Sequence, residues 1–167
     1  MKTGIFLSMM FFLFLACTSH QSNQLTNQQK DQIISELKKV IDSSIPKWEN
    51  ADTTGYLNYY LDSPDFISIN SDGSKSDYRA FKKEIIDQFN SSTSRSFSKY
   101  TVNFIVLNKN IVICTFLGEG SMTLKSGDKI SFYPSTATMI YKKIDGQWKV
   151  TYIHESGTFT AQRIDKK

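Results

Sequence analysis

The chain has 167 residues, of which 13% are aromatic, and a formal net charge of +4 at pH 7. The basic residues are scattered over separate segments and form no basic stripe with interleaved aromatic residues, which argues against nucleic-acid binding. With only two histidines and two cysteines, no metal site of histidine and cysteine ligands is expected, and nothing in the sequence calls for a cofactor.

The N-terminal segment has the pattern of a secretory signal peptide, with a lysine followed by an almost unbroken apolar run. That run is well short of the roughly 20 residues that a transmembrane helix needs. It ends in "FLAC", which resembles the lipobox of bacterial lipoproteins, where cleavage before the cysteine accompanies lipidation of its sulfur. We therefore predict a signal peptide at 1–16, a lipidated Cys17 with a polar tether at 17–25, and anchoring in the cell envelope on the periplasmic or surface side of a membrane. The alternative is an ordinary signal peptide with a chance cysteine.

The remaining chain is long enough for one domain, predicted at 26–160 and followed by a polar tail at 161–167. Apolar residues spaced by three and four predict a helix from residue 27 to about 45, with Thr26 as N-cap. Pro46 is predicted to interrupt or kink it, and the alternative is that the helix resumes through "KWENAD". A short helix at 53–61 and a third helix at 76–89 follow, with a short strand, "FISI", between them. The polar stretch "NSSTSRS" is predicted to be a loop.

Four long strands are predicted in the second half, in the segments "YTVNFIVL", "IVICTFLGEGSMTL", "ISFYPSTATMIYKK" and "WKVTYIHES". The fold class is therefore α+β, with three N-terminal helices packed on a curved antiparallel sheet. "DG" at 145–146 is a strong signal for a two-residue hairpin turn. Counting outward from it places Tyr141 opposite Val150, Met139 opposite Tyr152 and Ala137 opposite His154. Taking Ser126 and Gly127 as the preceding turn places Cys114 opposite Met139 and Phe116 opposite Ala137.

Opposed residues share a face of a sheet, so the same count predicts which side chains line the interior. The predicted inner face mixes aromatic, small and isolated polar residues, which is typical of a ligand pocket. Its candidates are Phe116, Ser135, Met139, Tyr152, His154 and Asn103. The opposite face is also apolar and is predicted to form a homodimer, because three helices can cover only one face; it carries Ile113, Thr115, Ile140 and Ile153.

Three segments resemble the nuclear transport factor 2-like, or SnoaL-like, cone fold: Trp48 after the first helix, "DFISINSDG", and "STATMIYKKIDGQWKVTYIHESG". The last segment resembles the association domain of calcium/calmodulin-dependent kinase II, with Trp148, His154 and Ser156 at matching positions. The resemblance implies a cone-shaped domain and adds Trp48 to the pocket. Tyr59 is a further candidate for the aromatic wall of that pocket. Enzymes of this family need a positioned acid or base, and the isomerase-type carboxylate is missing near Asn70. Met139 replaces an arginine of the kinase domain.

His154 has three interpretations that the sequence leaves open: a buried histidine hydrogen-bonded to a neighbour such as Trp48, Tyr59 or Ser135, a ligand-binding group, or a catalytic base. Glu155 is predicted to point away from the pocket. No second catalytic group is expected beside His154. The preferred hypothesis is a membrane-anchored lipoprotein whose cone binds a small, largely apolar ligand or supports a complex without catalysis. The alternative is a lyase, isomerase or hydrolase that uses His154.

Overall fold

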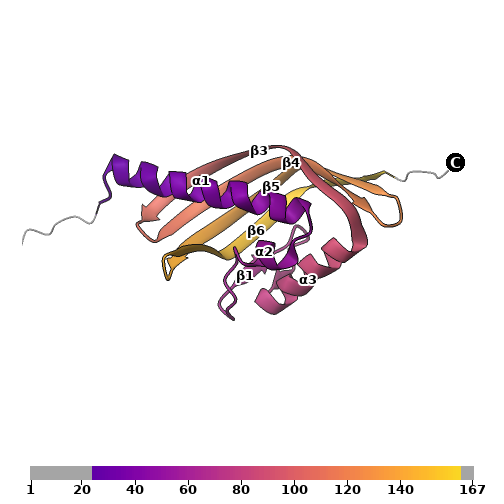
Figure 1. The fold of residues 1–167 in the computed structure, drawn as a ribbon, viewed down its shortest axis with the longest axis horizontal. Helices are drawn as coiled ribbons and strands as arrows, with labels where there is room; N and C mark the ends of the chain where they lie inside the picture. The colour runs from indigo at the N-terminus through magenta and orange to yellow at the C-terminus, as the bar shows by residue number, and fades with distance from the viewer. Residues whose placement is uncertain (1–23, 163–167) are drawn as a thin grey trace, which may run out of the picture.

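The computed structural model describes residues 24–162, so Cys17 and the predicted signal peptide lie outside the described residues. Three helices lie on one face of a six-stranded sheet of order β2-β1-β6-β5-β4-β3, in which β1 and β6 are parallel and all other neighbours antiparallel (Figure 1). This confirms the predicted α+β class. The elements are α1 Asn27–Glu49, α2 Thr53–Leu57, β1 Ile67–Ile69, β2 Lys75–Ser76, α3 Tyr78–Ser91, β3 Ser92–Asn108, β4 Ile111–Leu124, β5 Lys129–Ile144 and β6 Gln147–Gln162.

Helix α1 lies along the concave face of the sheet. Thr26 caps it as predicted, in a reciprocal arrangement with Gln29 that satisfies two backbone N–H groups. Pro46 lies within the helix, which continues to Glu49 instead of ending at 45. The last turn is fixed by tertiary contacts, because Trp48 is buried and its carbonyl accepts a hydrogen bond from Arg95 Nε at 3.0 Å. No helix among residues 24–162 is long and apolar enough to span a membrane.

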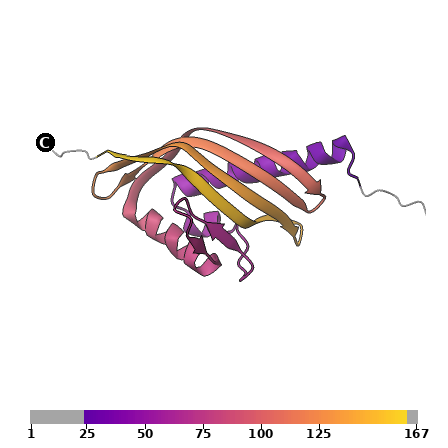
Figure 2. The same cartoon turned by 180° about the vertical axis from the view of Figure 1, so that it is seen from behind.

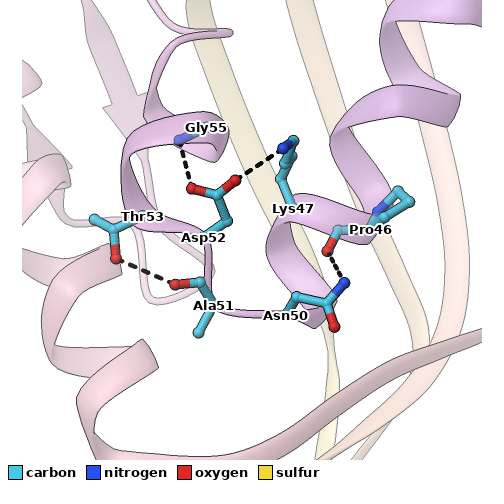
Figure 3. A network of polar contacts seen from close by, with 7 residues as sticks. All are labelled: Pro46, Lys47, Asn50, Ala51, Asp52, Thr53 and Gly55. Atoms are coloured by element: carbon cyan, nitrogen blue, oxygen red, sulfur yellow. Dashed lines mark hydrogen bonds and ion pairs between the residues drawn. The ribbon is translucent and has the colours of Figure 1, made fainter.

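A tight junction turns the chain from α1 into α2 (Figure 3). Asp52 caps α2 by accepting a hydrogen bond from the Gly55 N–H at 2.9 Å, and its other carboxylate oxygen pairs with Lys47 at 2.8 Å. A side chain at Gly55 would collide with the Asp52 carboxylate, since a Cβ there would lie 2.4 Å from its Oδ2. The junction fixes the direction in which α2 leaves α1, and therefore places the tyrosines of the α2 segment opposite the sheet.

The polar stretch after α3 is a strand, so the predicted loop "NSSTSRS" is wrong. Strand β3 begins at Ser92, directly after α3, and its first polar residues are buried at Ser92 and Arg95 and exposed between them. Arg95 is buried, donates hydrogen bonds to the Trp48 carbonyl and to Ser92 Oγ, and lies 4.8 Å from the centre of the Phe89 ring. A cationic side chain therefore packs where a periodicity count expects an apolar residue.

The core lies between the helices and the inner face of the sheet. Its fully buried side chains come from both layers and include Leu37 of α1, Phe66 before β1 and Val150 of β6. On the sheet, Cys114 faces Met139, Phe116 faces Ala137 and Tyr141 faces Val150, as the hairpin count predicted. The opposite face, turned to the viewer in Figure 2, carries exposed Ile105, Leu107 and Leu117.

Three of the irregularities in the strand pairing bear on the predicted pocket residues. The β3–β4 register shifts between Val106 and Asn108, so that Phe104 faces Cys114, and Asn103 lies on the outer face. The β5–β6 register shifts between Ile140 and Tyr141, where Thr151 is the extra residue of β6. A third shift at 133–134 of β5 offsets a one-residue difference at the preceding turn. Each bulge reverses the alternation of side chains beyond it and bends the strand.

Candidate functional site

A cavity of about 260 Å³ lies between the C-terminal half of α1, the α2 segment, α3 and the concave face of the sheet. This volume is slightly below the roughly 300 Å³ at which common ligand pockets begin, so the cavity suits a compact molecule. Aromatic, aliphatic and thioether side chains dominate its wall, including Trp48, Tyr56, Tyr59, Tyr60, Phe81, Ile85, Phe97, Phe116, Met122, Phe132, Met139, Tyr141 and Ile153. Its polar side chains are Ser44, Asn70, Glu84, Gln88, Ser135, Glu155 and Ser156.

Five of the eight predicted pocket residues line this cavity: Trp48, Tyr59, Phe116, Ser135 and Met139. The predicted inward orientation of the other three is wrong. His154 is exposed and pairs with Thr138 on the outer face, Tyr152 pairs with Ile140 there, and Asn103 is exposed on the outer side of β3. Ile153, predicted for the outer face, is buried and lines the cavity.

The bulge at Thr151 explains this reversal. Regular pairing continues from the hairpin turn to Val150, and one extra residue then shifts the rest of β6 by one position. Thr151 is itself buried, and its hydroxyl donates a hydrogen bond to the Ile140 carbonyl at 3.3 Å. Beyond it, Ile153 and Glu155 turn inward. Glu155 therefore occupies the place in the cavity that the sequence assigned to His154.

Glu155 is a carboxyl group of the cavity whose pKa is shifted. Its side chain lines the cavity and remains exposed to solvent. Desolvation raises the pKa of Glu155 above its ordinary value, and the negative charge of Glu84 raises it further. Glu84 lies on α3 and accepts a hydrogen bond of 2.6 Å from Ser76 Oγ. Two carboxyl groups therefore face one largely apolar cavity from opposite layers.

A pair of tyrosine hydroxyls lies deeper in the same cavity. The oxygens of Tyr56 and Tyr60 are 2.7 Å apart, and the two ring centroids are 5.3 Å apart. Desolvation raises the pKa of both hydroxyls, so both stay protonated at physiological pH. Because each hydroxyl also has acceptor capacity, the pair can donate or accept one further hydrogen bond to a molecule in the cavity.

Phenylalanine rings form one end of the cavity wall, and two glycines of β4 allow them to pack there. A Cβ at Gly118 would lie 2.6 Å from the Phe116 ring, and one at Gly120 would lie 2.6 Å from the Phe132 ring. Phe97 completes the cluster, with its ring centroid 5.3 Å from that of Phe116 and 4.7 Å from that of Trp48. The Trp48 indole N–H donates to Gln88 Oε1 at 3.2 Å, which fixes the orientation of the indole.

Several lining residues were missed by sequence reasoning. Glu84 and Gln88 are four residues apart on α3 and so share a face, a signal that the sequence contains. Glu155 had no such signal, because the bulge at Thr151 has no glycine and no turn residue.

Cys114 is buried in the core and desolvation raises the pKa of its thiol to about 12, which makes it an inert apolar residue.

Two other features of the described chain are weaker candidates. A more open hollow of about 530 Å³ lies beside α2 and the β5–β6 hairpin. One of the charged groups that line it, Lys149, is already bonded to the carbonyl and amide oxygens of Asn58. Within residues 24–162, no group of three or more histidine, cysteine, aspartate or glutamate side chains is arranged to hold a metal ion. The aromatic cavity is therefore the candidate site.

No protein-family model matches the sequence, and a sequence search of curated proteins found no match. Solved structures match the fold. A protein assigned as a scytalone dehydratase from Novosphingobium aromaticivorans has a TM-score of 0.73 at 9% identity, covering 83% of this chain and 93% of that chain. A type 3 hexachlorocyclohexane dehydrochlorinase from Novosphingobium barchaimii has a TM-score of 0.66 at 9% identity, covering 82% of this chain and 94% of that chain.

A third similar structure bears on the resemblance noted in the sequence. It is a protein assigned as a calcium/calmodulin-dependent protein kinase II association domain from Xanthomonas campestris, with a TM-score of 0.58 at 16% identity, covering 74% of this chain and 86% of that chain. The chain therefore has the nuclear transport factor 2-like cone fold, as predicted. Proteins with this fold include enzymes such as dehydratases and dehydrochlorinases as well as members of unknown function. The fold does not by itself define an activity.

Proposed function

We propose that this protein binds a compact, largely apolar molecule inside the cone. The observation that carries the proposal is the cavity of about 260 Å³, whose wall is mostly apolar and rich in aromatic rings and whose few polar groups lie at definite positions. Aromatic walls contribute a large apolar contact area, and a small number of polar groups fixes the orientation of a ligand. The Tyr56–Tyr60 hydroxyl pair and Glu155 are the groups proposed to orient it.

Filling the cavity tests this proposal. Ala137 lines the cavity, whereas its neighbour Thr138 lies on the outer face of the same strand. Ala137→Phe is expected to abolish binding of a bicyclic probe such as 1-naphthol in calorimetric titration. The matched variant Thr138→Phe is expected to bind as the wild type does. Equal binding by wild type and Ala137→Phe, with unchanged circular dichroism, would place the ligand elsewhere.

A second candidate function is catalysis of an elimination, and the inward carboxyl of Glu155 favours it. A carboxyl group with a raised pKa in an apolar site suits proton transfer near neutral pH. In such a step Glu155 would take a proton from a carbon, the C–H electron pair would form a double bond, and the leaving group would depart with its own electron pair. Turnover lost in Glu155→Gln but retained in His154→Ala would support it. Turnover lost only in His154→Ala would contradict this assignment, because His154 lies outside the cavity.

We further propose that the domain is held at a bacterial membrane through lipidated Cys17. The support is the "FLAC" sequence after the apolar N-terminal run and the polar segment that follows it. Several acyl chains attached at one cysteine would anchor the protein stably, since each buried CH₂ contributes about 0.8 kcal/mol. Cys17→Ala is expected to release the protein into the soluble fraction or to block its processing. An unmodified cysteine in soluble wild-type protein would refute the proposal.

We also propose that two copies associate through the outer face of the sheet. The supporting residues are Ile113, Thr115 and Ile140 at its centre, with Leu117 exposed beside them. Ile153 is not part of this surface, because it points inward. An uncompensated charge is costly to bury, so Ile140→Lys is expected to give monomers or aggregates. A monomeric wild type at micromolar concentration in light scattering would exclude the dimer.

A further inference from the structure

The charged groups of the cavity are of one sign. Glu84 and Glu155 are its lining carboxylates, and no lysine, arginine or histidine is among the described residues that line it. The chain as a whole is basic, with 20 lysines and arginines against 16 aspartates and glutamates. The cavity therefore has the opposite charge to the rest of the molecule.

The carboxylate of Glu155 has no cationic partner within the described part of the chain. The pKa of Glu155 is raised by desolvation and by the negative charge of Glu84, and no hydrogen bond from a side chain or backbone group contributes to the shift. Neighbouring cations are engaged elsewhere. Arg95 bonds to the Trp48 carbonyl behind the cavity wall, and Lys83 pairs with Asp87 at 2.6 Å on the outside of α3. This carboxylate is therefore available to pair with a positively charged group that enters the cavity.

The aromatic wall supplies a second interaction with a positive charge. The rings of Trp48, Tyr56, Tyr60 and Phe97 surround the same space that the two carboxylates face. The face of an aromatic ring attracts a cation within about 6 Å of its centre, most strongly when the cation is desolvated. Carboxylates and aromatic rings around one space are the combination expected around an organic ammonium group.

We propose that the ligand of this cavity is an organic cation: an apolar body that carries a protonated amine or a quaternary ammonium group, held by Glu155 and Glu84. This inference rests on the proposed ligand-binding function. The body occupies the aromatic part of the cavity, and the positive charge lies between the carboxylates of α3 and β6. A neutral ligand would leave the Glu155 carboxylate without a partner, and an anionic ligand would be repelled by both carboxylates.

The proposal predicts a definite dependence on pH. The ionisable groups that face Glu155 are Glu84 from α3 and the Tyr56 and Tyr60 hydroxyls from the α2 segment, and both tyrosines remain neutral. Affinity for a quaternary ammonium compound, whose own charge does not titrate, therefore rises with pH as Glu155 loses its proton. Affinity for an uncharged ligand of the same shape has no such rise.

The test uses three probes of similar size that differ in charge: benzyltrimethylammonium, its uncharged isostere neopentylbenzene, and phenylacetate. Isothermal titration calorimetry on the full chain is expected to give the tightest binding for benzyltrimethylammonium. Glu155→Gln should weaken the binding of that cation by about 10- to 100-fold, the range for loss of a charged partner. It should leave neopentylbenzene unaffected. His154→Gln, the neighbouring residue on the outer face, is the matched control and should change neither.

The outcomes separate this inference from the proposed function. If neopentylbenzene binds as tightly as the cation, the cavity is a ligand site and the cation proposal is wrong. If phenylacetate binds best, the proposal is also wrong. If no probe binds, both the inference and the proposed function fail. Glu84→Gln provides a second variant if Glu155→Gln does not fold, and unchanged cation affinity in that variant would likewise overturn the role given to the carboxylates.

Discussion

Ile153 and His154 exchange faces because of the bulge at Thr151, and paired alanine substitutions test this exchange. Ile153 is 3% exposed and lies within the main core, opposite Met139. Truncation of a buried isoleucine removes apolar contacts and leaves a cavity, so Ile153→Ala is expected to lower the free energy of unfolding by about 2–5 kcal/mol. His154 is exposed, and His154→Ala is expected to change the free energy of unfolding by no more than about 0.5 kcal/mol.

The free energies are measured by urea denaturation followed by far-ultraviolet circular dichroism. The m-values are compared to verify that both variants expose the same amount of surface on unfolding. A regular β6 strand would give the reverse order, because His154 would then be buried and Ile153 would lie on the outer face. A large loss for His154→Ala together with a small loss for Ile153→Ala would therefore refute the bulge, and with it the position of Glu155 in the cavity.

Other substitutions test the wall of the cavity and its charge. Arg95→Met removes the hydrogen bond to the Trp48 carbonyl and should cost about 1.5–3 kcal/mol in urea denaturation; a neutral effect would contradict that contact. Gly120→Ala places a Cβ 2.2 Å from a backbone oxygen and should cost about 1–3 kcal/mol, so unchanged stability would exclude that close approach. Because the pKa of Glu155 is raised in the folded state, the free energy of unfolding should fall as the pH rises from the ordinary pKa of a glutamate to the raised pKa. Glu155→Gln should remove this loss, and identical pH profiles of stability for the wild type and the variant would refute the shift.

Much of the fold follows from local sequence patterns. The helix from residue 27 with its Thr26 cap, the third helix and the four long strands each carry enough periodicity to be recognised, and the "DG" turn fixes the register as far as Val150. The Cys114–Met139 pairing was predicted correctly, although the turn from which it was counted differs by one residue. The bulge at 133–134 compensates that difference, so the agreement rests on two offsetting shifts.

The cavity was predicted less well, because its residues depend on bulges. Asn103, Tyr152 and His154 each lie beyond a point where one strand has an extra residue, and each was assigned to the wrong face. These bulges reflect the curvature needed to wrap the sheet around the helices, and they have no glycine at the extra residue that would mark them locally. Trp48 lies on a helix, and Phe116 and Met139 lie where the two offsetting shifts leave the alternation unchanged, so their positions were predicted correctly.

A crystal structure of the protein soaked with benzyltrimethylammonium would show which groups hold a cationic ligand. We expect electron density for one ligand molecule inside the cone, with its ring beside Trp48 and its ammonium group beside Glu155, while His154 points outward from the opposite face of the sheet. An empty cavity at saturating ligand, or density beside an inward-facing His154, would contradict this expectation.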